Sequence, residues 1–137
     1  MANTVEFELV APEELLFSES VELVVVPGAE GDFGVLPGHS PLISTLRTGV
    51  IAVYENDTVN RRIFVSGGFA EVTPERCTVL ADEAVALESV NRSDVEERVE
   101  ADRDLFDAAS DDDKENAAAA LAVSEALLLA LDTVGQA

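Results

Sequence analysis

The chain has 137 residues, 47% of them hydrophobic, and carries 28 Asp and Glu against 8 Lys and Arg, a formal net charge of −20. This length fits one domain or a small domain with an appendage, and the hydrophobic content excludes an acidic disordered tail. The charge argues against nucleic acid, which is bound through phosphate neutralisation by Lys and Arg, and against an anionic membrane surface.

Nothing in the sequence predicts secretion or membrane insertion. The one cysteine, Cys77, cannot form an intramolecular disulfide. The N-terminal residues lack the basic and apolar regions of a signal peptide. The longest apolar span, 117–131, contains Glu125 and falls short of the ~20 residues that a transmembrane helix needs. We therefore expect an intracellular protein without a membrane-spanning segment.

Residues 1–87 have the composition of strands and turns. Apolar residues alternate with Glu6 and Glu8 over 5–9, and a β-branched run ends at Pro27-Gly28. Residues 55–57 and 73–75 resemble hairpin turns, and Gly67-Gly68 favours a bulge or a close backbone approach. Strands are predicted over 5–9, 21–26, 50–54, 59–65, 69–72 and 77–80. Closely spaced strands predict a sandwich or barrel, and the absence of crossover helices argues against a parallel sheet.

Residues 88–137 have the composition of helices, with Gly135 as their one glycine and no proline. Ser93 to Glu96 matches a capping box, which predicts Ser93 as the first cap. Residues 110–113 interrupt the pattern, and a second helix of strong helix formers follows over 117–131. The two helices should pack as an antiparallel hairpin. The predicted seam contains Val95, Val99, Phe106 and Ala109 on the first helix and Ala120, Val123, Leu127, Ala130 and Val134 on the second.

No constellation in the sequence predicts catalysis. The only histidine, His39, adjoins Ser40, but no nucleophile elbow is present, and a loop histidine at a surface is the simpler interpretation. Zinc would need more Cys and His, and residues 111–113 lack the spacing of a calcium loop. Asp32 in the glycine-containing stretch 31–34 would repel a phosphate. The residues by themselves therefore predict an interaction or structural protein that has no metal or cofactor.

Two blocks of the sequence resemble the epsilon subunit of the rotary F-type ATP synthase. They are Glu30-Gly-Asp-Phe-Gly-Val-Leu-Pro-Gly-His-Ser-Pro-Leu42 and Ser66-Gly-Gly-Phe-Ala-Glu-Val72, with supporting segments at 10–17, 46–49 and 78–82. The resemblance implies an α+β fold: an N-terminal antiparallel β-sandwich of two sheets over 1–87, then an antiparallel two-helix hairpin over 88–137. It also implies a non-catalytic subunit of the central stalk that binds the gamma subunit and the ring of c subunits, and couples proton-driven rotation to ATP synthesis.

By position in the motif, the resemblance implies Glu30, Asp32 and Phe33 for the ring-facing loop, and His39 and Pro41 for the gamma-facing surface. Phe33 and Pro41 could instead only shape the sandwich, since buried aromatic residues serve cores and interfaces alike. The implied location is the cytoplasmic face of the bacterial plasma membrane, as a peripheral part of the F1 sector. A free-standing β-sandwich adaptor and a small hydrolase using His39 remain as alternatives.

The hairpin departs from the family pattern. Many relatives insert it into the catalytic head of alpha and beta subunits with the help of basic residues, but 116–134 contains no Lys or Arg. Some relatives bind ATP through an Asp-x-x-Arg motif, whereas Asp94 and Arg98 are four apart here, the spacing of a surface ion pair on a helix. We therefore predict weak or absent inhibition of ATP hydrolysis and weak or absent ATP binding.

Overall fold

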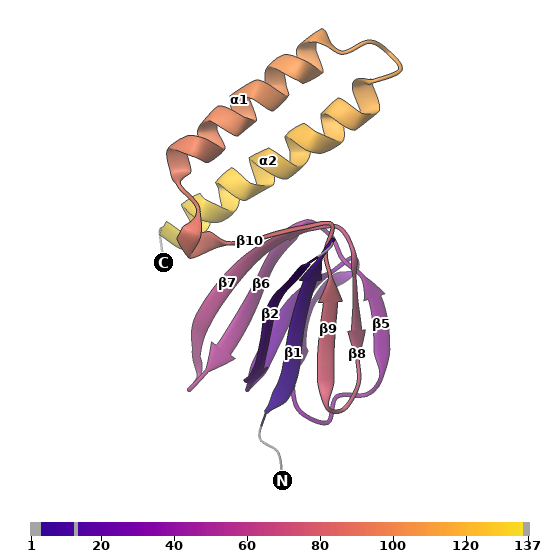
Figure 1. Ribbon diagram of the computed structural model, residues 1–137, viewed down its shortest axis with the longest axis vertical. Helices are drawn as coiled ribbons and strands as arrows, with labels where there is room; N and C mark the ends of the chain where they lie inside the picture. The colour runs from indigo at the N-terminus through magenta and orange to yellow at the C-terminus, as the bar shows by residue number, and fades with distance from the viewer. Residues whose placement is uncertain (1–3, 13, 136–137) are drawn as a thin grey trace. The chain divides into compact units, whose positions relative to one another are not determined.

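Two five-stranded sheets form in the computed structural model, which describes residues 4–12 and 14–135 (Figure 1). Sheet I has the strand order β2-β1-β9-β8-β5 and sheet II the order β10-β7-β6-β3-β4. The bounds in sheet I are β1 Val5–Ala11, β2 Glu14–Val21, β5 Leu42–Thr45, β8 Phe69–Val72 and β9 Arg76–Leu80. Those in sheet II are β3 Leu23–Gly28, β4 Gly31–Val35, β6 Gly49–Glu55, β7 Thr58–Ser66 and β10 Glu83–Ala86.

The chain separates into two compact units, Met1–Ala86 and Leu87–Ala137. The first unit holds the two sheets, and the second holds a short 3₁₀ turn, η1 (Leu87–Ser89), followed by the helices α1 (Arg92–Ala108) and α2 (Lys114–Gly135). A β-sandwich followed by two helices confirms the predicted fold class. The division at 86/87 lies one residue before the change in composition that the sequence shows.

The sandwich core lies between the inner faces of the two sheets. In β1 the apolar side chains of Val5, Phe7 and Leu9 are buried, while Glu6 lies on the outer face. Alternation of this kind buries one face of a strand in the core. Residues of both sheets complete the cluster: Val21, Val24, Val26, Val35, Leu46, Ile51, Val53, Ile63, Val65, Ala70, Val72, Cys77, Val79 and Ala81.

An aromatic stack joins the edge of sheet I to sheet II. The Phe17 ring of β2 lies 5.3 Å from the buried Phe7 ring, centroid to centroid. The guanidinium carbon of Arg61, on β7, lies 4.8 Å from the Phe17 centroid. Arg61 Nε also lies 3.6 Å from a carboxylate oxygen of Glu19. Charge and ring face together fix the edge strand against the opposite sheet.

Four strands were not predicted, namely β2, β4, β5 and β10, and the predicted strand over 21–26 is divided. Val21 ends β2, and β3 begins at Leu23 and continues through Pro27-Gly28. Each of the four strands has a single neighbour in its sheet. Edge strands bury little of their surface, so their sequences lack a strong alternating pattern. In β2, most side chains are exposed.

One strand pair corrects the expectation of purely antiparallel sheets. Strands β1 and β9 are parallel, with Phe7 opposite Cys77 and Leu9 opposite Val79. Parallel neighbours need a long connection, and here the intervening chain runs through both sheets instead of a crossover helix. Local sequence patterns carry no information about a pairing between residues so far apart.

The predicted turn chemistry is confirmed at two places. Asn56 and Asp57 connect β6 to β7 with φ of 54° and 63°, the left-handed conformation of a two-residue hairpin turn. Gly68 has a φ of 100°, and a Cβ placed there would lie 1.9 Å from the carbonyl oxygen of Leu80. Gly68 therefore marks the close backbone approach that the Gly67-Gly68 pair predicted.

In the second unit α1 and α2 pack on each other as an antiparallel pair (Figure 1). The N-cap of α1 is Asn91, whose side-chain oxygen accepts a hydrogen bond from Ser93 N at 2.9 Å. The predicted cap at Ser93 was therefore two residues late, because an Asn side chain caps as well as a Ser side chain. Glu96 instead lies one helical turn from Arg92, their charged groups 3.7 Å apart.

The predicted seam between the helices is correct in part. Val95, Val99 and Leu127 are buried, whereas Ala120 is exposed and Ser124 takes a buried position that was not predicted. Phe106, Ala109, Val123 and Ala130 are half-buried. The side chain of Val134 lies outside the described residues. The Ser124 hydroxyl donates to the Leu121 carbonyl at 3.2 Å, which explains how a polar residue occupies the seam.

Helix α2 differs from the expectation that no apolar span is long enough to cross a membrane. By length and composition, residues 114–133 are long and apolar enough to cross a membrane, with a mean hydropathy of 1.3. The helix is longer than the predicted apolar span because its charged ends remain helical. Its Glu125 and Asp132 pair with Arg103 and Arg92 of α1, so the described helix carries ion pairs along its length.

Candidate functional site

The first candidate region is the turn between β3 and β4, where Glu30 lies exposed. Arg47 holds this turn: its Nη1 donates to Gly28 O at 2.6 Å, its backbone N donates to Pro27 O at 3.0 Å, and its Nη2 donates to Asp32 Oδ1. We call residues 28–32 with Arg47 the tip. The carboxylates of Glu30 and Asp32 are both exposed, and that of Asp32 is paired with Arg47.

Asp32 and Phe33 belong to strand β4, and of the three predicted ring-facing residues only Glu30 lies in a turn. The Phe33 side chain is half-buried and packs against the sandwich core. Its ring also lies over Gly28, where a Cβ would come within 2.9 Å of the ring. Packing therefore fixes Phe33 and supports the structural interpretation of this residue, while its exposed part remains available for contact.

The second candidate region is the turn that contains His39. Leu36 O accepts a hydrogen bond from His39 N at 3.1 Å, with Pro37-Gly38 between them, the pair typical of a type II turn. Gly38 N donates to Pro74 O at 2.7 Å and anchors this turn to the β8–β9 hairpin. His39 Nδ1 lies 2.7 Å from Ser40 O, and Pro41 is exposed.

The structure places these two regions at opposite ends of β4 and β5. The tip lies beside Thr45, whose carbonyl accepts a hydrogen bond from Ala29 N at 2.9 Å. The His39 turn lies beside Pro74, where β8 ends. The two groups of residues therefore lie at separate places on the sandwich.

Sequence reasoning missed a row of apolar side chains across the outer face of sheet I. Leu15, Val10, Leu80 and Phe69 stand opposite one another in consecutive strands β2, β1, β9 and β8. Leu15 is 57% exposed, Phe69 42% and Leu80 38%. We call these four residues the apolar row. Exposed apolar patches of this kind mark interaction surfaces.

A shallow hollow adjoins the apolar row, and one apolar side chain extends the same face. The hollow has a volume of about 340 Å³ and is lined by row residues together with Pro12, Gly68 and Asp82. On the edge strand β5, Ile43 pairs with Glu71 and is 70% exposed. The outer face of sheet I therefore combines apolar contact area with acidic side chains at its margin.

Among the residues that the structure describes, no three His, Cys, Asp or Glu side chains are placed to hold a metal ion. The His39 ring contacts the backbone carbonyl of Ser40 through Nδ1, and this group is neither a hydroxyl nor a carboxylate. Burial raises the pKa of the Cys77 thiol to about 12, which keeps it protonated and unreactive.

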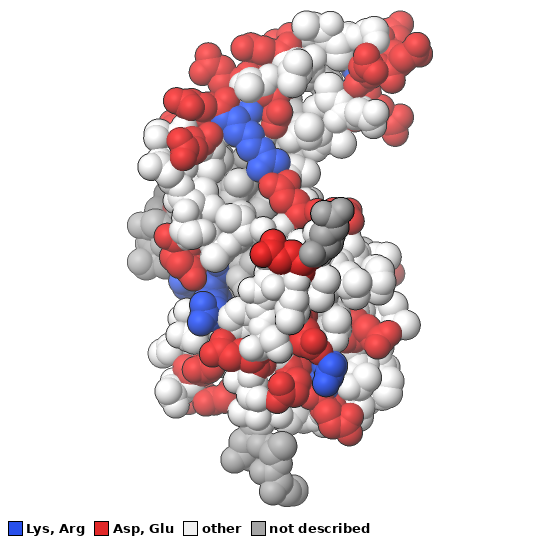
Figure 2. All heavy atoms as spheres, viewed as in Figure 1, with Lys and Arg blue, Asp and Glu red and all other residues white. Residues whose placement is uncertain are grey.

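The helical unit presents an acidic surface, and on the face in Figure 2 red side chains cover much of it. Its four basic residues are engaged within the unit: Arg92 with Asp132, Arg98 with Asp102, and Arg103 with Glu125. Lys114 Nζ donates to the Phe106 carbonyl at 2.8 Å and lies 4.2 Å from the Phe106 ring centroid. These contacts connect α1 to α2 or stabilise α1 itself.

Comparison with known proteins gives consistent matches. The family model described as "ATP synthase, Delta/Epsilon chain, beta-sandwich domain" matches residues 4–87. The chain is 60% identical over 131 residues to the ATP synthase epsilon chain of Rhodospirillum rubrum, covering 95% of this chain and 98% of that one. It is 48% identical over 132 residues to the epsilon chain of Paramagnetospirillum magneticum, covering 96% and 99%.

Solved structures that resemble this chain also come from ATP synthases. A chain in the Euglena gracilis mitochondrial ATP synthase, solved as OSCP, F1 and c-ring, superposes with a TM-score of 0.79 at 26% identity, covering 96% of this chain and 83% of that one. A chain in the central stalk and c-ring of the Tetrahymena thermophila mitochondrial ATP synthase superposes with a TM-score of 0.57 at 13% identity, covering 93% and 96%. At 13% identity, the second match indicates a similar fold and nothing more.

Proposed function

We propose a function from one premise: this chain belongs to the family of ATP synthase epsilon chains. It serves as a non-catalytic subunit of the central stalk and couples proton-driven rotation of the c-ring to ATP synthesis in the catalytic head. It is a peripheral part of the F1 sector on the cytoplasmic face of the bacterial plasma membrane and does not insert into the bilayer. The observation that carries the proposal is 60% identity to a curated epsilon chain along nearly the whole length of both proteins.

The gamma subunit binds the outer face of sheet I. His39 and Pro41 lie at one end of the edge strand β5, and Ile43 continues this surface along the strand toward the apolar row. Burial of exposed side chains such as Phe69 and Ile43 supplies the apolar contact area. The fixed type II turn supports this role, because a preformed surface loses little conformational entropy on binding.

The c-ring binds the tip. Glu30 is the charged group that meets basic residues in the polar loops of the ring, and Phe33 adds contact through its exposed part. Asp32 adds an exposed carboxylate to this surface, and its contact with Arg47 holds the turn in shape. A tip that is already fixed in the free subunit suits a contact that must transmit torque.

The hairpin inhibits ATP hydrolysis weakly or not at all and binds ATP weakly or not at all. Its net charge is −10, from 14 acidic and four basic residues over 88–137. All four basic residues already contact groups within the hairpin, so an acidic segment of the catalytic head would have to displace these contacts. Repulsion between like charges opposes such an interface.

Co-purification tests the stalk assignment. The tagged chain, expressed with the other subunits of its synthase, should bring down gamma and the c-ring. Glu30→Lys should lose the ring and keep gamma, whereas Glu75→Lys, a charge reversal at another exposed position in the β8–β9 turn, should keep both. Recovery of the chain without gamma and the ring would instead indicate a free-standing adaptor.

The gamma interface has its own matched pair of variants. Ile43→Asp should lose gamma, because it places a charge on the proposed contact face. Leu105→Asp, at a comparably exposed apolar position of the helical unit, should not. Equal loss in both variants would refute the assignment of this face.

Truncation tests the regulatory part separately. Deletion of residues 88–137 should change the rate of ATP hydrolysis by the assembled complex less than about twofold, since no basic surface holds the hairpin in the head. Strong activation by the deletion would contradict weak inhibition. Calorimetric titration of the isolated chain with ATP should give no saturable micromolar binding.

A further inference from the structure

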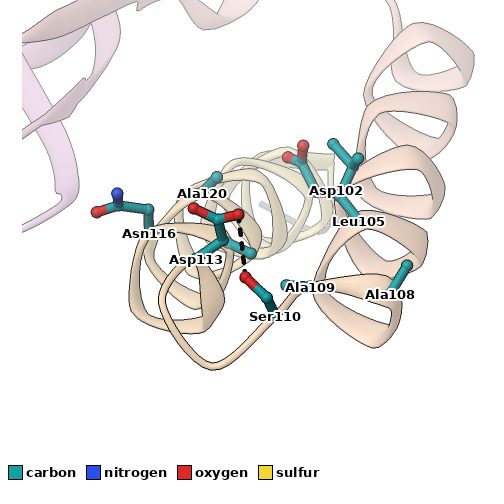
Figure 3. A pocket seen from close by; sticks show the side chains of 9 residues that line it. Asp102, Leu105, Ala108, Ala109, Ser110, Asp113, Asn116 and Ala120 are labelled. Carbon is teal, nitrogen blue, oxygen red and sulfur yellow. Dashed lines mark hydrogen bonds between the residues drawn. The ribbon is translucent and has the colours of Figure 1, made fainter.

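The helical unit has a hollow of about 580 Å³ where the end of α1 meets the start of α2 (Figure 3). Alanines and Leu105 make up much of its lining, and both carboxylates that line it have partners within the unit. The Ser110 hydroxyl donates to Asp113 at 3.2 Å, and Asp102 lies 3.9 Å from Arg98. Neither carboxylate is therefore left to select a charged partner. The contacts that connect the two proposed partner surfaces lie in the sandwich instead.

A short segment joins the tip to sheet I. Residues 45–47, which we call the link, run from the end of β5 in sheet I toward β6 in sheet II. Thr45 O accepts a hydrogen bond from Ala29 N at 2.9 Å, and Leu46 forms an isolated β-bridge with Gly28. The link therefore holds the turn of the tip along its backbone.

The other side of the link is anchored beside the apolar row. Thr45 stands opposite Phe69 of β8, and Leu46 N donates to Gly68 O at 3.0 Å. The Leu46 side chain is buried in the sandwich core. Close-packed interiors have low compressibility and transmit strain. The link therefore connects the tip firmly to the face that we propose for gamma.

Arg47 supplies the side-chain part of this connection. Its guanidinium donates to Gly28 O at 2.6 Å through Nη1 and to Asp32 through Nη2. These two acceptors lie on either side of the turn that presents Glu30, and a rigid, planar guanidinium suits contact with two acceptors at once. Strand β4, to which Asp32 belongs, is an edge strand with β3 as its one neighbour. Arg47 therefore gives this edge of sheet II a second attachment.

Stability alone does not account for this arrangement. The side chains of Arg47 and Asp32 are 45% and 59% exposed, and exposed ion pairs contribute little to stability. Arg61, whose side chain is 42% exposed, also joins the two sheets through an ion pair, but it does so between β2 and β7, which do not pair with β3, β4 or β5. The feature that distinguishes Arg47 is that its contacts converge on the proposed ring surface.

We propose that Arg47 is a positioning residue for the coupling of the ring to gamma. This rests on the proposed function, in which the tip meets the c-ring and the outer face of sheet I meets gamma. A subunit bound to both partners transmits force between them only while its two contact surfaces keep their relative positions. Arg47 keeps them in place by tying the turn of Glu30 to the link. Without its side chain the tip yields under load, although both partners stay bound.

The test compares two activities of one complex. The assembled synthase is placed in lipid vesicles, and ATP hydrolysis and ATP-driven proton uptake are measured on the same sample. In Arg47→Ala, the number of protons taken up per ATP hydrolysed should fall about twofold or more, because loosening a functional contact by about 1 Å is enough to impair it. Arg47→Lys should recover part of this ratio, since an amine keeps the charge but lacks the planar fork. Arg61→Ala is the matched control and should leave the ratio unchanged.

Co-purification of gamma and the ring with each variant separates positioning from binding. Arg47→Ala should bring down both partners, as the parent chain does. Loss of either partner would overturn the proposal, and so would an equal fall of the ratio in Arg61→Ala. A parent chain that brings down neither gamma nor the ring would refute the stalk assignment and the positioning role with it. An assembled Arg47→Ala complex that takes up as many protons per ATP as the parent would refute the positioning role alone.

Discussion

Replacement of Gly68 by alanine should destabilise the sandwich more than any other glycine-to-alanine change at a positive φ. The added Cβ would lie 1.9 Å from Leu80 O and 2.9 Å from the Cα of Ala81, both backbone atoms at the end of the neighbouring strand β9. Real Cβ atoms essentially never approach within 3.0 Å. The backbone must therefore move, and the Phe69–Leu80 pair of the apolar row moves with it.

The expected cost has two parts. A positive φ at a residue other than glycine costs about 1–3 kcal/mol, and overpacking typically adds about 1–3 kcal/mol. Gly68→Ala should therefore lower the free energy of unfolding by about 2–6 kcal/mol. Gly31 is the matched control, since its φ is 137° but a Cβ there would meet nothing within 4 Å. Gly31→Ala should cost about 1–2 kcal/mol, because reduced freedom of the unfolded chain partly offsets the strain.

The chain offers a selective probe for this comparison. It contains no tryptophan, and its one tyrosine, Tyr54, lies in β6 of the sandwich. Tyrosine fluorescence during urea or thermal unfolding therefore reports on the sandwich and not on the hairpin. A difference of about 2 kcal/mol corresponds to about 10 °C in Tm for a domain of this size. Equal losses for the two variants would refute the argument, because backbone strain alone would then explain both.

Three further predictions follow from single contacts. Burial raises the pKa of Cys77 from 9.0 to about 12. The free energy of unfolding of the sandwich should therefore fall by up to about 1.4 kcal/mol per pH unit above pH ~9. In Cys77→Ala, unfolding measured from pH 8 to 11 should show a smaller fall. Asn91→Ala should lower hairpin stability by about 1 kcal/mol, whereas Ser93→Ala should cost less in helix unfolding followed by circular dichroism; the reverse order would restore the cap to Ser93. Arg47→Ala should speed amide hydrogen exchange at the tip and change global stability by less than about 1 kcal/mol, because its ion pair with Asp32 is exposed.

Much of the fold follows from the sequence, because strong local patterns coincide with buried elements. Apolar and polar residues alternate along strand β1, and Asn56-Asp57 form the predicted hairpin turn between β6 and β7. The edge strands could not be predicted from the sequence, because a strand with one neighbour and much exposed surface does not need alternating apolar and polar residues. The parallel pairing of β1 with β9 does not follow either, since it joins residues about 70 positions apart.

Only those parts of the candidate site that lie within one short segment of the sequence could be predicted. The turns that contain Glu30 and His39 are marked by Gly and Pro, whose backbone preferences act within a few residues. The apolar row is set by the register of four strands, so no single segment shows it. The sequence shows one local sign of this row: apolar and polar residues stop alternating in β9, where apolar Leu80 follows the buried Val79 but lies on the opposite face. Similar breaks elsewhere in the sequence are too common to identify an interface.

The position of β1 between β2 and β9 in sheet I has a consequence for synthesis of the protein on the ribosome. Strand β1 is made first, but its neighbour β9 begins only at Arg76. Until that residue has left the ribosome, the nascent chain can pair β1 with β2 only, and the other edge of β1 stays open. Pairings between distant segments close slowly, and open strand edges promote aggregation in the meantime. The first strand of the sandwich thus gains its second neighbour near the end of sandwich synthesis, and chaperone contacts should concentrate on nascent chains in which β9 has not yet emerged.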